Sequence, residues 1–515
     1  MLKLFSAGRA KHPLVDSRQV DALVKSLPVT DSSTALATLI EHFEELSQLD
    51  DVPVLAWIDS GERFDSAAQL HARRVARDCF AATGTSNPMQ NAQLRQFWER
   101  AANALTKPFD ALTDADRESE GLRKVQTAAV ARALRAWAQV FKWRQLEYLA
   151  VDPVVWGRIY SLYALIESVE QTNATTKPHP RISFETTVRR EFMRIVAFDV
   201  AHPSEFEGHF VEPLDRVLDH CAAVFDLHTA PQDLPHPLAN FGFDLRATKP
   251  PTRVSGRLDP CAGLRFLNGA RVLQPLQALL DEITIGQRIP ESLGIETACD
   301  PIDLQRLTQH LMSIFGPNPP IRRLQRRAIQ VPIQIVRGWD CLIETIAPQV
   351  VDTPISDGPR ELELVESESL NDSWITEAIG IGGLAAVAPR WDAQAHTIGA
   401  LLGVRAQSAS DWQVGIVRRL ERRTTGGVLV GVDTISLAPR ICTLTAPNAP
   451  SRQTETAVLL DDPQGKAEVR VLFRPGVAAA GVAIDAVYGE HTLRLVPQQL
   501  SAASSDYEVM LCATS

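Results

Sequence analysis

The sequence lacks the features that typify secreted, membrane-spanning and metal-binding proteins. Its 515 residues include seven cysteines, none of them in a Cys-x-x-Cys pair. Such an odd, scattered set is typical of reduced thiols rather than of a disulfide framework or a zinc site. The segment Met1–Ser6 has no apolar core of a signal peptide, and no apolar run approaches the roughly 18 residues that cross a bilayer. We therefore expect a cytoplasmic protein with no membrane span.

Basic excess and catalytic motifs are also missing. The chain has 52 Lys and Arg against 62 Asp and Glu, a net charge of −10, which argues against DNA as a partner. No dinucleotide-binding, P-loop, zinc-protease or nucleophile-elbow motif occurs in a suitable setting. The sequence therefore predicts no catalytic residues, no cofactor and no enzymatic activity.

One short cluster of metal-ligand types, His220, Cys221 and His228, is weak evidence for a metal site. On a helix, adjacent side chains point about 100° apart, and a residue eight positions later lies roughly 12 Å further along the axis. A continuous helix cannot bring the three side chains together. We therefore predict no metal ligands.

The first part of the chain has helical periodicity. Leu36, Leu39, Ile40 and Phe43 fall on one helical face, and Asp31 or Ser32 is a plausible N-cap. Further helices are predicted at 15–27, 67–80, 92–105, 125–149, 154–169, 184–200, 213–225, 269–283 and 303–315. Antiparallel helix pairs are the natural packing for such a series, and no fixed repeat recurs.

The second part reads mostly as strands. Gly316–Pro320 is the clearest boundary because no helix continues through it. We expect a lead-in over 1–30 and a helical module over 31–315, with a proline-rich break near 231–252 that contains a short extended piece at 241–245. A linker with an arginine cluster follows over 316–327, then a β-barrel over 328–439 and a β extension over 440–515. Predicted strands are 328–336, 361–370, 381–387, 398–404, 455–460, 468–473, 482–488, 491–496 and 507–512, with a short helix or loop at 341–347.

A β-hairpin anchors this second part. Trp412–Arg419 and Val428–Ile435 have strand-like sequence, and Thr425-Gly426-Gly427 between them supplies the positive φ angles of a tight turn. The strand that ends in Val-Arg-Arg, the glycine turn and the following Val-Gly-Val-Asp resemble the closing hairpin of PilZ domains. That resemblance covers 321 to about 439. It implies a multidomain α + β protein, in which an all-α N-terminal helical module precedes a PilZ-like antiparallel β-barrel.

Many PilZ domains bind the bacterial second messenger cyclic di-GMP, and their ligand motif has two parts. Arg-x-x-x-Arg before the first strand is matched by Arg322/Arg326 or Arg323/Arg327. The second part, Asp/Asn-x-Ser-x-x-Gly, is matched at its start by Asn371 and Ser373, with Thr376 at the glycine position. The resemblance therefore implies ligand binding by Arg322, Arg323, Arg326, Arg327, Asn371 and Ser373.

The chemistry of these residues suits that ligand. A guanidinium can donate two parallel hydrogen bonds to guanine O6 and N7, and it is planar enough to stack on a base. Alternatively, the arginines only solvate a linker. Trp374 could stack on a base or pack in the core, and Arg418–Arg423 could hold phosphates or form the solvated end of the hairpin.

We expect a non-enzymatic cyclic di-GMP receptor that couples nucleotide binding at the barrel to the helical module, which would contact an unidentified protein partner. The alternative is an adaptor or scaffold protein with a degenerate barrel that binds no ligand. A weaker third possibility, an RNA-binding barrel, predicts steeply salt-dependent affinity for single strands.

Overall fold

The structure is a computed structural model of the chain, which divides into two compact units. The second unit begins at residue 322 and also takes in residues 204–206. Each unit is described separately. The structure describes residues 12–81, 87–110, 112–179, 184–230, 240–254, 261–295, 299–319, 327–347, 372–380, 382–392, 396–409, 411–424, 426–445, 454–463 and 467–514.

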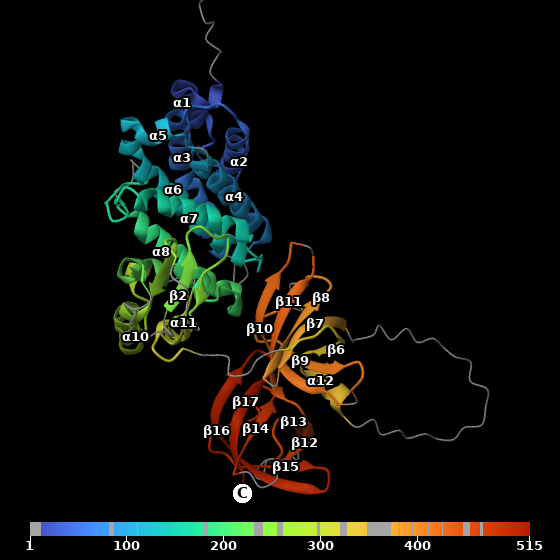
Figure 1. The fold of residues 1–515 in the computed structure, drawn as a ribbon. Coiled ribbons are helices and arrows are strands. Elements are labelled where there is room, and N and C mark those ends of the chain that lie inside the picture. The colour runs from blue at the N-terminus through green and yellow to red at the C-terminus, as the bar shows by residue number, and fades with distance from the viewer. Residues whose placement is uncertain are drawn as a thin grey trace, which may run out of the picture. The chain divides into compact units, whose positions relative to one another are not determined.

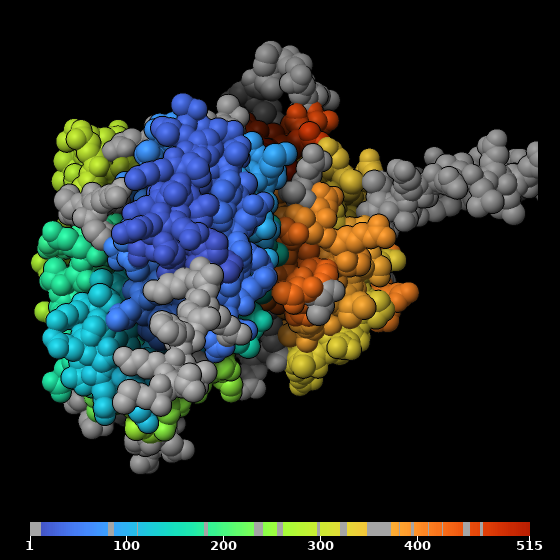
Figure 2. Space-filling view, turned by 90° about the horizontal axis from the view of Figure 1, so that it is seen from above, coloured from blue at the N-terminus to red at the C-terminus, as the bar shows by residue number. Residues whose placement is uncertain are grey.

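The first unit is built mainly of helices, as the periodicity predicted (Figure 1). In the space-filling view its earliest helices, coloured blue, pack into one continuous face (Figure 2). Its helices are α1 (Ser17–Ser26), α2 (Ser32–Gln48), α3 (Val54–Ala81), α4 (Pro88–Asp110), α5 (Asp114–Glu118), α6 (Glu120–Gln145), α7 (Pro153–Glu167), α8 (Val188–Val200), α9 (Val211–Cys221), α10 (Leu273–Gly286) and α11 (Pro301–Phe315).

Local sequence explains where these helices begin. Asp31 caps α2, because its side-chain oxygen accepts a hydrogen bond from the backbone N–H of Thr34 at 2.9 Å. Asp152 caps α7 in the same way, and Pro153 stands at the first helical position, where its missing N–H is not needed. Such caps satisfy N–H groups that have no partner within the helix.

Helix α6 is the centre of the first unit. It packs against α3, α4, α7, α8 and α9, and its side chains are buried around most of its circumference. Trp137 is 2% exposed and donates from Nε1 to Thr106 Oγ1 at 2.9 Å. A helix buried on nearly all sides must find partners for its polar side chains inside the protein.

A small antiparallel sheet follows α9 within the first unit. Its strands are β1 (Asp226–His228), β2 (Asn240–Asp244), β3 (Thr252–Arg253) and β4 (Leu264–Asn268), in the order β1-β4-β2-β3. The extended piece predicted at 241–245 is therefore confirmed as β2, but the sequence did not predict its pairing. The buried Asn268 donates to Asn240 at 2.6 Å, which ties β4 to β2.

The first sheet of the second unit closes on itself. Its strands run in the order β5-β7-β6-β9-β10-β11-β8, and β8 pairs back with β7. The expected hairpin is confirmed as β10 and β11, with Gly426 and Gly427 at φ of 85° and 79°. The elements are β5 (Arg327–Ala328), β6 (Pro332–Arg337), α12 (Gly338–Ile346), β7 (Asp372–Gly380), β8 (Gly383–Ala388), β9 (Leu401–Ala406), β10 (Gln413–Arg422) and β11 (Val428–Ser436).

The expected C-terminal β extension is a closed barrel of its own, in the order β12-β13-β14-β17-β16-β15. Buried residues from both sheets, including Trp412 and Val458, share one core cluster with α12, and Tyr507 Oη donates to the Gly399 carbonyl at 2.8 Å. The strands are β12 (Arg440–Thr445), β13 (Thr454–Leu459), β14 (Glu468–Phe473), β15 (Ile484–Tyr488), β16 (His491–Ala503) and β17 (Glu508–Thr514). The boundaries proposed for the five chain segments stay predictions.

Candidate functional site

A cavity of about 720 Å³ lies in the first unit, lined mainly by α3, α6 and α9. This volume is within the roughly 300–1,000 Å³ of small-molecule sites. On α3 the lining residues include Asp65, Gln69 and Arg73, each four positions after the last, so that they share one face of the helix. On α6 the lining residues include Arg132, Arg135, Gln139 and Lys142, at a similar spacing.

The cavity is rich in positive charge, although the chain as a whole is acidic. Seven arginine and lysine side chains line it, against four carboxylates. The cations are Arg73, Arg77, Arg132, Arg135, Lys142, Arg194 and Arg216, and the carboxylates are Asp65, Glu212, Asp215 and Asp219. A concave site with an excess of cations favours an anionic ligand.

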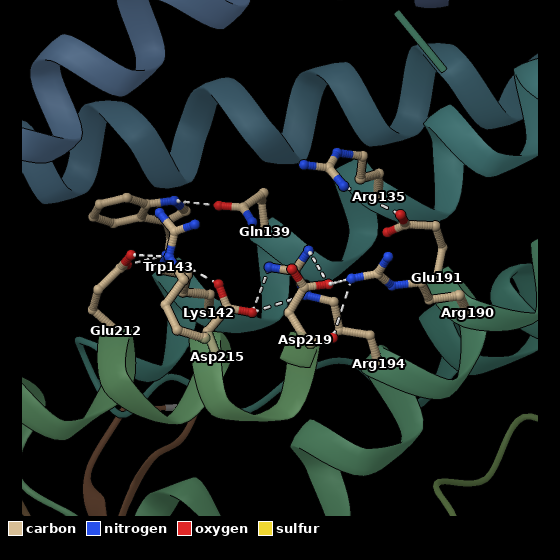
Figure 3. Close-up of polar contacts among 11 residues, drawn as sticks. Arg135, Gln139, Lys142, Trp143, Arg190, Glu191, Arg194, Glu212, Asp215 and Asp219 are labelled. Carbon is tan, nitrogen blue, oxygen red and sulfur yellow. Dashed lines mark hydrogen bonds and ion pairs between the residues drawn. The ribbon is translucent and has the colours of Figure 1, made fainter. Parts of the chain in front are cut away.

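A network of buried ion pairs forms one wall of the cavity (Figure 3). Asp215 of α9 accepts from Arg194 Nε of α8 at 2.9 Å, and its other oxygen lies 3.1 Å from Lys142 Nζ of α6. These three side chains are 3%, 6% and 6% exposed. Lys142 also pairs with Glu212, and Arg190 pairs with Asp219 at 3.3 Å. The network ties together the three helices α6, α8 and α9.

The pKa values of Asp215 and Arg194 in this wall are shifted by the opposite charges around them. Burial by itself would raise the pKa of Asp215, but the charges of Arg194 and Lys142 outweigh burial and hold that pKa well below its ordinary value. Burial would lower the pKa of Arg194, but Asp215 and Asp219 raise it. The cations of this wall are therefore already neutralised by carboxylates.

Other cations of the cavity have fewer partners. Arg73 is exposed, and it makes no ion pair or hydrogen bond with any residue that the structure describes. Arg77 is also exposed and pairs only weakly with its neighbour Asp78, at 3.4 Å. Arg135 pairs with Glu191 at 3.2 Å and lies 4.3 Å from the centre of the Phe184 ring. Arg73 and Arg77 can therefore meet a phosphate without giving up a buried ion pair, whereas Arg135 would share its guanidinium with the fully buried Glu191.

The inner end of the cavity contains a buried Asp–His pair. Asp65 Oδ2 lies 3.2 Å from His179 Nδ1 and 3.7 Å from Arg132 Nε. Burial raises the pKa of Asp65 to about 6, against the opposing charge of Arg132. Burial, then the charges of Arg135 and Arg132, lowers the pKa of His179 to about 3, so that the imidazole is neutral at pH 7.

The residues implied by the PilZ resemblance fall only partly within the described structure. Arg322, Arg323, Arg326 and Asn371 lie outside the described residues. Arg327 is exposed in β5 and Ser373 is exposed in β7. The β5–β7 register places Arg327 opposite Ile379, six residues along β7 from Ser373, or about 20 Å at ~3.3 Å per residue. The structure therefore does not bring these two residues together.

Thr376, at the motif's glycine position, has a structural role. Its side chain is fully buried and its hydroxyl donates to the Ile329 carbonyl at 2.8 Å. The same oxygen accepts from the backbone N–H of Val331 at 3.0 Å. Thr376 thus fixes the segment that connects β5 to β6.

Burial and ion pairing bear on the alternatives weighed for Trp374 and for Arg418–Arg423. Trp374 is 1% exposed and therefore belongs to the core. In the Arg418–Arg423 run, Arg423 makes two hydrogen bonds to Glu377, at 2.6 and 2.7 Å, and Arg419 pairs with Glu421 at 2.7 Å. This end of the hairpin is thus partly neutralised by carboxylates.

The described residues contain neither a cluster of metal-ligating side chains nor a helix that could span a membrane. No group of three or more His, Cys, Asp or Glu side chains there could hold a metal ion, and His220 and His228 belong to separate elements, α9 and β1. Among the described helices, none is both long and apolar enough to span a membrane.

Comparison with known protein families gives a match in the helical part of the chain. Residues 18–232 match a family model described as the N-terminal domain of the cyclic-di-GMP receptor FimW. The match covers less than half of the chain and contains every residue that lines the cavity except Gly294. No curated protein and no solved structure matches the chain.

Sequence reasoning missed the cavity. Its signal was present as cations at helical spacing, Arg73 and Arg77 on α3 and Arg132 and Arg135 on α6, within segments that otherwise read as core helices. The apolar residues along one face of each helix predict the helix, but they give no role to the arginines that lie between them.

Proposed function

We propose that this protein is a non-enzymatic receptor for cyclic di-GMP and that the cavity of the first unit holds the ligand. The observation that supports this proposal is the coincidence of two features. The segment that resembles a cyclic-di-GMP receptor domain also contains the lining of a cavity with an excess of arginines.

The chemistry of the cavity suits a cyclic dinucleotide. Its two phosphates would be met by Arg73, Arg77 and Arg135, since charge-assisted hydrogen bonds from guanidinium groups to phosphate are strong and directional. A base would stack on Phe184, an aromatic lining residue that is only partly buried. Arg194 and Lys142 would support the wall rather than bind phosphate, because buried carboxylates already neutralise them.

The arginines that precede the first barrel remain a second proposed site. Arg322, Arg323, Arg326 and Arg327, with Asn371 and Ser373, would clamp the ligand as the PilZ resemblance implies. Because Arg322–Arg327 lie where the chain passes from one unit to the other, ordering them on the ligand would couple binding to the helical unit and to a protein partner. Because Arg327 lies opposite Ile379, six residues along β7 from Ser373, the contacts near Ser373 would have to come from Arg322, Arg323 or Arg326.

Isothermal titration of the full chain with cyclic di-GMP tests the proposal and separates the two sites. The variant Arg73→Ala/Arg77→Ala removes two cavity cations, and Arg323→Ala/Arg327→Ala removes two barrel cations. Each hydrogen bond to a charged group contributes about 1.5–3 kcal/mol, so we expect the cavity variant to bind at least ~10-fold more weakly. The matched control is Arg74→Ala, because Arg74 is the neighbour of Arg73, does not line the cavity and donates to the Val29 carbonyl.

The possible outcomes distinguish the two binding sites and the adaptor alternative. Weaker binding in the cavity variant alone supports the cavity, and weaker binding in the barrel variant alone transfers the site to the barrel. The absence of binding by the unmodified protein at high concentration would refute the receptor function. The adaptor alternative, with the helical unit as the surface for a protein partner, would then be preferred.

A further inference from the structure

The inner end of the cavity has buried hydrogen-bonding atoms that no described residue satisfies. They are Oδ2 of Asp65 and both ring nitrogens of His179, since Oδ2 and Nδ1 lie 3.2 Å apart but do not form a hydrogen bond. The two side chains are 2% and 4% exposed, and both line the cavity. A buried polar group without a hydrogen-bond partner is destabilising, so several of them at a cavity wall indicate a partner that comes from outside the chain.

The chemistry of these atoms differs from that of the rest of the cavity. Oδ1 of Asp65 accepts from Gln69 Nε2 at 2.9 Å, which leaves Oδ2 as an open acceptor. A neutral imidazole has one donor nitrogen and one acceptor nitrogen. The inner end thus offers acceptors, whereas Arg73, Arg77 and Arg135 offer only donors. A ligand that satisfies both must be anionic in one part and carry N–H donors in another.

Guanine carries N–H donors of this kind. Its Watson–Crick edge presents N1–H beside the N2 amino group, two adjacent donors for which Oδ2 of Asp65 and the acceptor nitrogen of His179 are available. Adenine presents an acceptor, N1, at the corresponding position, and a carboxylate would face its lone pair. Enzymes that hold an unpaired base read this same edge by hydrogen bonds and stack the base on aromatic side chains.

A stacking surface lines the same cavity. The guanidinium of Arg135 lies 4.3 Å from the centre of the Phe184 ring, and both side chains line the cavity together with Asp65 and His179. A base whose edge meets Asp65 would therefore lie close to a planar cation that can stack on it.

We propose that Asp65 and His179 read the Watson–Crick edge of a guanine base and make the cavity selective for guanine over adenine cyclic dinucleotides. This inference rests on the proposed function. It adds the residues that determine specificity and assigns them a different part of the ligand from the phosphate-binding arginines.

The test compares three ligands by calorimetric titration of the full chain: cyclic di-GMP, cyclic di-AMP and cyclic di-IMP, which lacks the N2 amino groups. For the unmodified protein we expect cyclic di-AMP to bind at least ~100-fold more weakly than cyclic di-GMP and cyclic di-IMP ~10-fold more weakly. In Asp65→Asn the preference for cyclic di-GMP over cyclic di-AMP should fall by about 10–100-fold, as expected for loss of a hydrogen bond to a charged group.

Asp219→Asn is the matched control, since Asp219 also lines the cavity but is paired with Arg190 at 3.3 Å. It should leave the ratio of the two affinities unchanged. The inosine comparison uses the unmodified protein, so it can refute the inference even if Asp65→Asn does not fold.

Two results would overturn the inference while leaving the receptor function intact. They are equal affinity of the unmodified protein for cyclic di-GMP and cyclic di-IMP, or an unchanged guanine preference in a folded Asp65→Asn variant. If the unmodified protein binds no cyclic di-GMP, the proposed function is wrong and this inference is refuted with it.

Discussion

Replacing Asp215 by Asn should strongly destabilise the first unit. Asp215 accepts from Nε and Nη2 of Arg194 at 2.9 and 2.5 Å and lies 3.1 Å from Lys142 Nζ. All three side chains are at least nine-tenths buried. The substitution keeps the size of the side chain and removes its charge, so two buried cations lose their shared counter-ion.

The magnitude follows from desolvation. A buried ion whose partner is removed has neither water nor an opposite charge, and breaking such a pair typically costs about 3–5 kcal/mol. Glu212 still pairs with Lys142, which offsets part of the loss on that side. Arg194 is left with Asp219 at 3.9 Å. We therefore expect Asp215→Asn to lower the free energy of unfolding by ~3 kcal/mol or more.

Urea unfolding followed by far-ultraviolet circular dichroism is the suitable assay. Apart from α12, the described α-helices belong to the first unit, so the helical signal reports chiefly on that unit. Asp219→Asn is the control, because Asp219 is 24% exposed and its removal should cost about 1 kcal/mol. A loss below ~1 kcal/mol for Asp215→Asn would show that the network is not desolvated as described.

Two further predictions concern His179 and the turn into β8. Burial lowers the pKa of His179 to about 3, so its contribution to stability is complete above pH ~6.5 and decreases by up to about 1.4 kcal/mol per pH unit below that. The His179→Gln variant lacks this pH-dependent contribution, so the difference in free energy of unfolding between the unmodified protein and the variant should shrink from pH ~7 to ~4 in urea titrations. If that difference stays constant with pH, the lowered pKa of His179 is wrong. Gly383→Ala should cost about 2–4 kcal/mol in calorimetric unfolding of the second unit, because a Cβ would lie 2.2 Å from the Val432 carbonyl oxygen, with φ at 149°. Gly382→Ala meets nothing within 4 Å and is its control, and equal losses for the two would refute the steric argument.

Features that depend on near neighbours in the sequence were predictable. Periodic apolar residues predicted α2, α4, α6 and α7, because one helical face must be buried whatever the helix packs against. The hairpin β10–β11 followed from alternation and from two glycines that adopt positive φ. Strands β7 and β12 were missed. In β7 a register shift lies between Thr376 and Ala378, which breaks the alternation on which strand prediction relies.

The candidate site depended on contacts between distant parts of the sequence. The resemblance in the second part implied a cyclic di-GMP receptor, whereas the family match lies in the helical part. Arg327 and Ser373 belong to one motif in the linear pattern, but the β5–β7 register sets them six residues apart along a strand. Strand pairing decides such distances, and no local pattern encodes it.

The sequence alone determined that a helical module precedes a β-rich part, because helical and strand periodicities depend only on residues that are near one another in the sequence. Only the tertiary structure closed the two sheets of the second unit, and only it brought Asp65, Arg135 and Asp215 to one cavity from three separate helices. Burial then fixed their chemistry. Because Asp215 is buried, it needs the opposite charges of Arg194 and Lys142. The buried polar atoms of Asp65 and His179 that lack a hydrogen-bond partner are the basis for the proposed contact with a base.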